Sequence, residues 1–395
     1  MTKIPLLGNG IPFPERGIFC FWAMAGIYIH IPFCKSKCGY CGFYSLPSIK
    51  LKDRFLEALK VEIAERKDYL HGEPVGTVYF GGGTPSLLST EEIEGILHLI
   101  YIHYPLAENP EITLEANPDT LSLDYLQALR KVGINRLSIG IQSFFDNDLQ
   151  YLGRKHNAEH ARQCLSWAKQ AGFENLSIDL IYGLPTSNAE QWNRNLDLFF
   201  EAEIPHLSAY ALTLEPNSIL TKQIEIGKAA PVSEDDALRD YDILCQRAEE
   251  NGYLHYEISN FCRRGMHSKH NASYWFGTPY LGLGPSAHSF DGSSRQWNVS
   301  SVEKYLDAGL RDAGRETLSR EQTYDEYVML RLRTHWGIDL KWLKNKMGER
   351  FATHCEQQAQ PLIQQGRLTQ TREFLYLNDQ QMLFADGVAE ALMHN

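Results

Sequence analysis

Two periods of hydrophobic positions alternate along residues 26–215. Short apolar runs rich in β-branched and aromatic residues predict strands over 26–33, 77–81, 111–115, 136–142, 175–182 and 206–214. Between them, apolar residues with a helical period predict helices over 51–70, 90–101, 121–132, 158–171 and 189–200. Alternating strands and helices with nearly continuous apolar strands indicate a parallel sheet covered by helices. Because there are six such strands and not eight, we predict an α/β fold that is a partial (β/α)6, TIM-like barrel.

The strand–helix alternation stops beyond residue 216. The pattern then predicts a helix over 238–251, a strand-like segment over 256–261 and an aromatic-rich loop, and we expect 231–310 to complete the core of 24–230. From 311 to 395 it predicts three helices, two short strands and a last helix, with the three helices over 321–334, 340–346 and 351–365 and the strands around 366–369 and 374–378. Three helices with a small hairpin are similar to a winged helix, so we expect a C-terminal helical, winged-helix-like domain.

Residues 1–23 precede the first predicted strand, and we expect them to be a dispensable extension because Met24 leads directly into that strand. The apolar run over 18–33 crosses this point and resembles a membrane anchor. It is shorter than the ~20 residues that a spanning helix needs, it contains His30, and it continues into a cysteine-rich loop. We therefore predict no integral membrane segment.

The composition favours a globular enzyme over a nucleic-acid-binding protein or a disulfide-rich scaffold. A chain of 395 residues with 43% hydrophobic and 22% charged residues is ordinary for a globular enzyme. The formal net charge of −11 disfavours binding to nucleic acid, so we expect the C-terminal domain to serve as a packing or lid domain. The eight cysteines are too sparse for a disulfide scaffold, and we predict a cytoplasmic location, where thiols stay reduced.

Three of those cysteines share one short stretch. Cys34, Cys38 and Cys41 form a C-x3-C-x2-C run directly after the first predicted strand. Three thiolates can ligate three irons of a cubane cluster and leave the fourth iron open to another ligand. A structural zinc site is the weaker alternative, because it usually has four ligands in two pairs, and neither Cys20 nor Cys164 belongs to a second pair.

Polar or small residues follow the ends of the other predicted strands. They include the glycine-rich stretch 81–85, Glu115 and Gln142, while Asp179 lies within the fifth strand. In α/β barrels the active site is built at the carboxyl ends of the strands. We therefore expect these residues to meet the cysteine loop at one mouth of the barrel. A carboxylate between apolar neighbours, as at Asp179, needs a polar partner.

The strand Tyr28–Phe33 feeding the three cysteines, followed by Gly81-Gly-Gly-Thr-Pro85, resembles the radical S-adenosylmethionine enzymes. More narrowly, it is similar to the branch that holds oxygen-independent coproporphyrinogen III dehydrogenase and the HemW-type heme chaperones. The resemblance implies a [4Fe–4S] cluster on the three cysteines, S-adenosylmethionine on the open iron and a protein that donates electrons to the cluster. It also implies a cofactor site made of Tyr28, Tyr40, Gly82, Gly83, Thr84, Glu115, Gln142, Arg154 and Asp179. Alternatives remain: the glycines can form an ordinary turn, Glu115 can be solvated, and Arg154 can sit in a surface ion pair.

Two features of the sequence distinguish between the members of that branch. The dehydrogenase has a further cysteine where this chain has Phe43, and the heme chaperones have phenylalanine there, usually after an aspartate that is Gly42 here. The second is a segment that follows the H-N-x-x-Y-W pattern of the chaperones, His270, Asn271, Tyr274 and Trp275. The resemblance implies that these four residues contact heme, since imidazole is a common axial ligand and aromatic rings offer flat apolar surface. The alternative is that His270 is a hydrogen-bonding residue that shapes the barrel.

The sequence therefore predicts a heme chaperone that binds heme, a [4Fe–4S] cluster and S-adenosylmethionine and passes heme to an acceptor protein. The alternative is an oxygen-independent coproporphyrinogen III dehydrogenase, and the sequence leaves open whether the chain is an enzyme. Radical modification of nucleic acid is a third class, supported only by the winged-helix-like tail.

Overall fold

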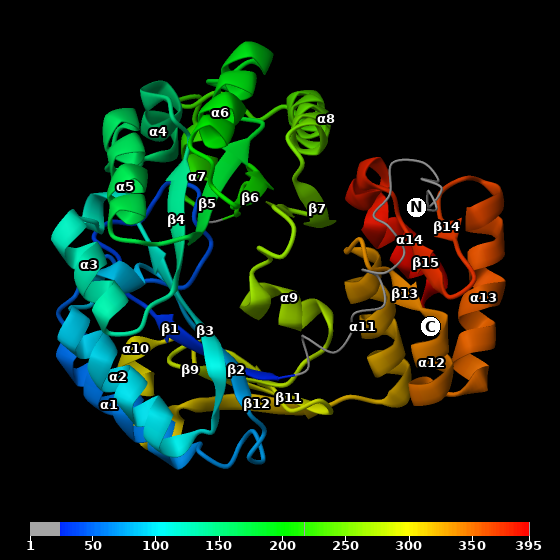
Figure 1. Ribbon diagram of the computed structural model, residues 1–395, viewed down its shortest axis with the longest axis horizontal. Helices are drawn as coiled ribbons and strands as arrows, with labels where there is room; N and C mark the ends of the chain where they lie inside the picture. Colours follow the sequence, from blue (N-terminus) through cyan, green and yellow to red (C-terminus); the bar gives the residue numbers. More distant parts are fainter. Residues whose placement is uncertain (1–23, 217, 395) are drawn as a thin grey trace, which may run out of the picture.

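The computed structural model describes residues 24–216 and 218–394 (Figure 1). The prediction that residues 1–23 are a dispensable extension lies outside the described residues. A large α/β core holds one curved sheet, and a smaller helical body follows it in sequence and packs beside it, drawn in orange and red in Figure 1.

Six parallel strands form the centre of the sheet, and each pairs with its sequence neighbour. Their bounds are β1 Ala25–Ile31, β2 Val75–Gly82, β3 Leu106–Ala116, β4 Arg136–Gln142, β5 Asn175–Tyr182 and β6 His206–Ala211. All six predicted strands are present, and the partial TIM-like barrel is confirmed. The predicted bounds of β4 and β5 match those of the structure.

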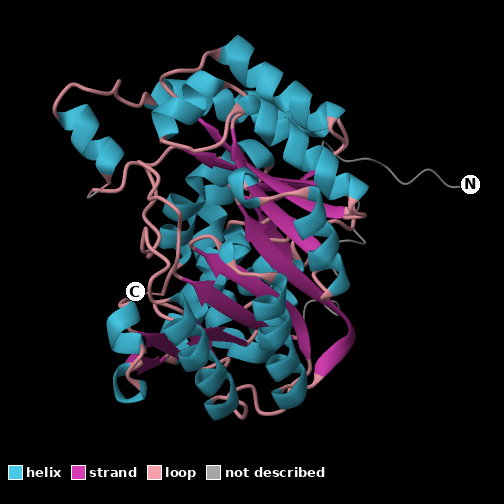
Figure 2. Ribbon diagram, turned by 90° about the vertical axis from the view of Figure 1, so that its left-hand side faces the viewer, coloured by secondary structure: helices cyan, strands magenta, loops and turns pink. Residues whose placement is uncertain are grey.

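Helices cover the outer face of these strands, as Figures 1 and 2 both show. They are α1 Lys52–Glu65, α2 Thr90–His103, α3 Leu123–Lys131, α4 Asp146–Leu152, α5 Ala158–Gln170 and α6 Ala189–Glu201. A capping box in which Ser89 and Glu92 satisfy each other's backbone amides begins α2. The short helix α4 was not predicted, because it starts within four residues of the end of β4 and has only seven residues.

Side chains on alternate positions of each strand face opposite sides of the sheet. On β1 the residues Ile27, Ile29 and Ile31 are fully buried in the apolar layer between sheet and helices. Tyr28 and His30 therefore point to the barrel interior. This division places the polar residues of the strands inside the barrel.

The sheet continues beyond the six parallel strands on both sides to a total of twelve. The added elements are α7 Ile219–Glu225, α8 Glu234–Glu250, β7 Leu254–Glu257, β8 Asn260–Cys262, α9 Lys269–Trp275, β9 Tyr280–Leu283, β10 His288–Phe290, β11 Ser294–Asn298, α10 Val302–Tyr305 and β12 Asp312–Thr317. β9 pairs parallel to β1, while β8 pairs antiparallel to β6. The aromatic-rich segment, which the sequence analysis treated as a loop, thus extends the sheet.

The C-terminal body has its own apolar core of residues between Tyr324 and Leu392. It consists of α11 Arg320–Leu332, β13 Ile338–Asp339, α12 Leu340–Met347, α13 Glu349–Gln364, β14 Thr369–Gln370, β15 Phe374–Tyr376 and α14 Ala385–Leu392. A small antiparallel sheet in the order β13–β15–β14 accompanies the helices. The expected C-terminal helical domain is confirmed, and the domain bounds assigned from sequence stay a prediction. Within 24–216 and 218–394, no helix combines the length and apolar character needed to cross a membrane.

Candidate functional site

The cysteine loop is fixed to the barrel at its base and at its middle. The Cys34 amide donates to the Leu46 carbonyl at 2.9 Å, which closes the base of the loop. In the middle, the Gly39 amide donates to the Leu152 carbonyl and the Gly39 carbonyl accepts from the Leu220 amide at 2.8 Å. The three cysteines are partly buried on this loop. The fold therefore holds all three thiols in one place beside the strand ends.

Two of the three sulfur atoms accept hydrogen bonds. The Thr84 hydroxyl donates to Cys34 Sγ at 3.5 Å, and the Arg154 guanidinium donates to Cys38 Sγ at 3.4 Å. Burial raises the pKa of the Cys41 thiol, and the neighbouring Cys38 and Cys34 raise it further. The three sulfurs thus lie within electrostatic reach of one another.

Among the described residues, no three His, Cys, Asp or Glu side chains are grouped to hold a single metal ion. A cubane cluster does not need such a group, because each cysteine ligates a different iron. The donor set, three thiols with polar donors on two of them, fits the implied cluster.

The glycine-rich stretch after β2 packs directly against the backbone before the cysteines. The Gly83 amide donates to the Ile31 carbonyl at 2.8 Å, and the Thr84 amide donates to the Phe33 carbonyl at 2.7 Å. A Cβ on Gly83 would lie 2.6 Å from the Phe33 oxygen, and Gly82 has a φ of +106°. The missing side chains therefore allow the loop to dock on β1, whereas contact of Gly82 and Gly83 with a ligand stays a prediction.

Arg154 connects the cysteine loop to two strand ends. Besides Cys38, its guanidinium donates to Asn117 Oδ1 at 2.7 Å and to the Gly140 carbonyl at 2.8 Å. Asn117 in turn donates to the Thr84 hydroxyl at 3.0 Å. The alternative of a surface ion pair is wrong, because the partly buried side chain is hydrogen-bonded inside the mouth.

Glu115 lies at the centre of the mouth. Its carboxylate accepts from the Tyr79 hydroxyl at 2.8 Å and from the Gly82 amide at 3.1 Å. Burial raises the pKa of Glu115 to about 7, and the charge of Asp179 raises it while the two donors lower it. A carboxyl with this pKa holds or releases a proton near neutral pH.

Asp179 has the polar partners that its position required. The Ser138 hydroxyl donates to its Oδ1 at 3.4 Å. Burial raises the pKa of Asp179 to about 6, and the Ser208 and Ser138 hydroxyls lower it in part.

At the end of β4, Gln142 has a φ of +68°, an uncommon backbone conformation for a residue with a side chain. Such strain is concentrated at functional sites.

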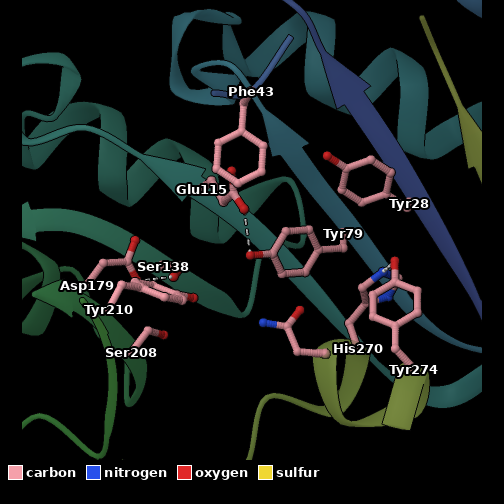
Figure 3. Close-up of a pocket in the computed structure, with 11 residues that line it drawn as sticks. Tyr28, Phe43, Tyr79, Glu115, Ser138, Asp179, Ser208, Tyr210, His270 and Tyr274 are labelled. Carbon is pink, nitrogen blue, oxygen red and sulfur yellow. Dashed lines mark hydrogen bonds between the residues drawn. The ribbon is translucent and has the colours of Figure 1, made fainter. Parts of the chain in front are cut away.

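Glu115, Asp179 and several of their neighbours border a cavity of about 210 Å³ inside the barrel (Figure 3). Phe43 of the cysteine loop lies at one end and His270 and Tyr274 at the other, with the Glu115–Tyr79 pair between them. The lining consists of Tyr28, Phe43, Tyr79, Glu115, Ser138, Asp179, Ser208, Tyr210, His270, Asn271 and Tyr274. The structure thus joins part of the predicted cofactor site to three of the four predicted heme residues.

Seven of the predicted cofactor and heme residues do not line this cavity: Tyr40, Gly82, Gly83, Thr84, Gln142, Arg154 and Trp275. Tyr40 packs in a small apolar cluster with Leu152 and Leu220 behind the cysteine loop. Trp275, the last residue of α9, is not part of the cavity lining described above.

His270 enters the barrel from the side opposite the cysteines. Its Nδ1 is 2.8 Å from Thr77 Oγ1, its Nε2 is 2.8 Å from the Tyr274 hydroxyl, and its amide donates to Glu111. Only 1% of the residue is exposed. Burial and the nearby Arg136 lower the pKa of His270 to about 3, so the imidazole is neutral. In this arrangement His270 is a hydrogen-bonding residue, and ligation of iron would require it to give up one of its two ring contacts.

Several lining residues were not predicted from the sequence. Tyr79, Ser138 and Ser208 lie on β2, β4 and β6, and all three line the cavity. Tyr79 also stacks on His270, with ring centroids 5.0 Å apart. Counting back two positions from Gly81, the predicted end of the second strand, would have found Tyr79, because alternate residues share a face.

Two family models match this chain, one in the barrel and one in the C-terminal body. Residues 28–199 match the Radical SAM superfamily and residues 318–384 match the HemN C-terminal domain. The chain is 34% identical over 376 residues to the heme chaperone HemW of Mycobacterium tuberculosis, covering 93% of this chain and 94% of that protein. It is 32% identical over 377 residues to the heme chaperone HemW of Bacillus subtilis, covering 94% and 99%.

One solved structure has the same fold over nearly the whole chain. Coproporphyrinogen III oxidase (HemN) from Escherichia coli, described as a radical SAM enzyme, superposes with a TM-score of 0.82 at 24% identity, covering 95% of this chain and 91% of that one. The likeness includes both the barrel and the C-terminal body.

Proposed function

Because this chain belongs to the HemW branch of the radical S-adenosylmethionine superfamily, we propose that it is a heme chaperone. In this proposal it binds heme, a [4Fe–4S] cluster and S-adenosylmethionine, and it passes heme to an acceptor protein. The support is similarity to proteins named heme chaperone over more than nine-tenths of the chain.

The observation that carries the proposal is the position of Phe43. The dehydrogenase of this branch has a cysteine at that place. Here the side chain is 70% exposed and borders the barrel cavity at the cysteine end. An apolar ring supplies neither a thiol nor a proton at this point, and it offers a surface on which a flat apolar ligand can pack.

The cluster is proposed to rest on Cys34, Cys38 and Cys41, and S-adenosylmethionine in the mouth. When bound, they would supply one-electron chemistry that cleaves the sulfonium. The protein orients them: Thr84 and Arg154 donate to two of the sulfurs and hold the loop to the strand ends.

The remaining residues of the proposed cofactor site are polar groups that face the mouth or support it. Glu115, with a pKa of about 7, can accept hydrogen bonds from hydroxyl or ammonium groups. Asp179 and Gln142 add further acceptors, and Tyr28 adds a ring stacked on Tyr79 with centroids 6.1 Å apart. Tyr40 supports the loop from behind through apolar contacts.

The heme contacts proposed from the sequence are His270, Asn271, Tyr274 and Trp275. Asn271 and Tyr274 border the cavity, which supports a role for them in ligand contact. An electron-donating protein and an acceptor protein are proposed partners, and the proposed location is the cytoplasm.

An oxygen-independent coproporphyrinogen III dehydrogenase is the second candidate. The observation that favours it is the shared fold with coproporphyrinogen III oxidase at a TM-score of 0.82, which extends through the C-terminal body. The absence of the additional cysteine at Phe43 weighs against it.

A heme titration tests the proposal. The full-length chain is reconstituted with iron and sulfide under anaerobic conditions and titrated with heme while the Soret band is followed. We expect saturable binding of one heme per chain with a dissociation constant in the micromolar range or tighter. Absorption that rises without saturation, as for heme adsorbed non-specifically, would contradict heme chaperoning.

A further inference from the structure

Tyr79 of β2 points into the barrel and not into the apolar layer beneath the helices. Its neighbours Val78 and Phe80 belong to that layer, and alternate residues of a strand face opposite sides. Tyr79 is 6% exposed and borders the barrel cavity (Figure 3). A buried tyrosine needs a hydrogen-bond partner for its hydroxyl. The identity of that partner therefore indicates what the residue does.

The partner is Glu115 of the neighbouring strand β3. The Tyr79 hydroxyl donates to Glu115 Oε1 at 2.8 Å, and the Gly82 amide donates to Oε2 at 3.1 Å. Each carboxylate oxygen thus has one donor, and both donors come from β2, so the plane of the carboxylate is fixed. Each oxygen can accept a second hydrogen bond. Because Glu115 lines the cavity, a ligand there can supply that bond.

Stacked rings hold the Tyr79 hydroxyl in place. Tyr79 stacks on His270 with ring centroids 5.0 Å apart and planes inclined by 24°, and on Tyr28 with centroids 6.1 Å apart and planes inclined by 25°. His270 is itself held through both ring nitrogens, by Thr77 and Tyr274. A ring packed in this way does not need to be ordered when a ligand enters, which lowers the entropic cost of binding. The hydroxyl is therefore preorganised for its acceptor.

The charge of Glu115 depends on its donors, because burial disfavours a carboxylate. Burial raises the pKa of Glu115 to about 7, whereas the Tyr79 hydroxyl and the Gly82 amide lower it. Other ionisable side chains act on Glu115 from neighbouring elements: Asp179 of β5, Tyr28 of β1, Tyr210 of β6 and Tyr274 of α9. Burial raises the pKa of each of these tyrosines, so they stay neutral, and the pKa of Asp179 is about 6. Tyr79 is therefore the side chain that favours ionised Glu115 by direct hydrogen bonding.

We propose that Tyr79 is a positioning residue of the cofactor site, whose hydroxyl orients the Glu115 carboxylate toward S-adenosylmethionine. The inference rests on the proposed cofactor and goes beyond it, because Tyr79 acts through Glu115. An oriented carboxylate suits a ligand that presents ammonium or hydroxyl donors. A phenylalanine ring at position 79 would fill the same space and leave one oxygen of Glu115 without its donor.

Titration of Glu115 in the cluster-free, full-length chain tests the pair without any cofactor. Infrared difference spectroscopy follows the band of protonated carboxyl groups with pH, and Glu115→Gln identifies the part that belongs to Glu115. The midpoint should lie near pH 7 in the wild type. In Tyr79→Phe it should rise by about one pH unit, the equivalent of a lost hydrogen bond to a charged group.

Tyr125→Phe is the matched control for the loss of a hydroxyl. Its hydroxyl donates to the Leu88 carbonyl at 2.7 Å, and Tyr125 lies outside the cavity lining. This variant should keep the infrared midpoint of Glu115 at its wild-type position. It should also bind S-adenosylmethionine as the wild type does.

Anaerobic equilibrium dialysis of S-adenosylmethionine against the full-length, cluster-loaded chain measures the effect on binding. Tyr79→Phe should weaken binding on the order of five- to tenfold between pH ~6 and ~7, because less of Glu115 is ionised there. The difference should shrink near pH ~9, where the carboxyl is ionised in both proteins. Protonation of the ligand also changes with pH, but equally for both proteins. A folding defect would weaken binding at every pH.

A double-mutant cycle tests whether Tyr79 acts through Glu115. In a Glu115→Ala background, Tyr79→Phe should change the dissociation constant by less than about twofold, because the acceptor of the hydroxyl is gone. If the ring of Tyr79 acted by packing alone, Tyr79→Phe would have the same effect in both backgrounds.

The outcomes distinguish the inference from the function on which it rests. If the wild type binds S-adenosylmethionine and Tyr79→Phe matches it, or is weaker by the same factor at every pH, the positioning role is overturned and the proposed cofactor stands. An unchanged infrared midpoint in Tyr79→Phe also overturns that role. If the cluster-loaded wild type shows no saturable binding of S-adenosylmethionine, the proposed cofactor fails and the positioning role fails with it.

Discussion

Glu115 and Asp179 face one small cavity, and both carboxyl groups are held closer to protonation than carboxyls in water. Burial raises the pKa of Glu115 to about 7 and that of Asp179 to about 6, and each carboxyl has hydroxyl donors that only partly offset the effect. Their mutual repulsion contributes to the shift of Glu115. A bound cation would stabilise both ionised carboxylates and so lower their pKa values. S-adenosylmethionine carries two cationic groups, an ammonium and a sulfonium.

The raised pKa of Glu115 predicts a pH-dependent gain in stability for the cluster-free variant Glu115→Gln. The folded chain binds this proton more tightly than the unfolded chain, so its stabilising contribution is complete below pH ~4.3 and is lost as pH rises through about 7. Glutamine does not ionise. Well above pH 7 the variant should be more stable than the wild type by about 3 kcal/mol, with little difference near pH ~4.

Thermal unfolding followed by circular dichroism at several pH values measures this difference. Glu108→Gln, at an exposed position of the same strand, is the control and should change Tm little at any pH. A difference between Glu115→Gln and the wild type that does not grow with pH would contradict the assignment.

Arg154 is predicted to tune the electron affinity of the cluster. Its guanidinium donates to Cys38 Sγ, and a positive donor stabilises the more negative, reduced cluster. Arg154→Gln should lower the reduction potential on the order of 40 mV, the equivalent of about 1 kcal/mol for one hydrogen bond. Potentiometric titration monitored by electron paramagnetic resonance gives the value. Arg162→Gln, on the exposed side of α5, should leave it unchanged. An unaltered potential in a fully loaded Arg154→Gln variant would show that the contact has no such role.

The site residues predicted from the sequence are mainly those that stand at the end of a recognisable strand. Cys34, Glu115 and Gln142 follow or end strands whose apolar pattern is clear, and their convergence on one cofactor stays a prediction. Tyr79 was missed because an aromatic residue in a strand is usually a core residue, and only the three-dimensional pairing with Glu115 reveals its role. The function of Arg154 was underdetermined for the same reason, since its partners lie 14 to 116 residues away in sequence.

The docking of the loop after β2 onto the end of β1 is the structural link between the sheet and the cysteine loop. Gly83 allows it, because a side chain there would meet the backbone of Ile31 and Phe33 at 2.6 to 2.9 Å. Neither partner can rotate away, since both are backbone atoms in or next to a strand. The position of Cys34 thus depends on a glycine that lies 49 residues later in the chain.

Gly83→Ala is predicted to destabilise the chain by roughly 1–3 kcal/mol, the usual cost of forcing extra volume into a packed site. It should also lower the amount of iron bound after reconstitution. Gly95→Ala is the matched control: it lies in α2 with open space around its missing Cβ, and alanine is the better helix former, so stability should rise by about 0.5–1 kcal/mol. Chemical denaturation and iron analysis of the two variants measure both effects, and equal stability and iron content in Gly83→Ala and the wild type would refute the docking role.

The elements that sequence predicted best are the long ones buried on both faces. β4 and β5 lie within the parallel part of the sheet, and nearly all of their residues are buried. The strands β9 to β12 have three to six residues each, which is too short for periodicity to distinguish them from loops. Their place in the sheet depends on pairing with β1, a contact between residues more than 250 positions apart.

At the scale of the whole molecule, the described residues include two large apolar cores, one in the α/β body and one in the C-terminal body. The barrel cavity meets the cysteine loop, and a larger cavity of about 820 Å³ lies between the C-terminal body, α9 and the first residues of β2. The segment 264–275 separates the two and contributes side chains to both.

The central claim is that this radical S-adenosylmethionine fold handles heme and does not make its precursor. The most direct measurement is mass spectrometry of tetrapyrroles after anaerobic incubation of the cluster-loaded chain with heme, coproporphyrinogen III, S-adenosylmethionine and a reductant. A coproporphyrinogen dehydrogenase run in parallel shows that the conditions support turnover. We predict one heme per chain, recovered chemically unchanged from the protein, and coproporphyrinogen III with all its propionates. Vinyl products formed together with stoichiometric 5′-deoxyadenosine, and no heme retained on the protein, would contradict the account.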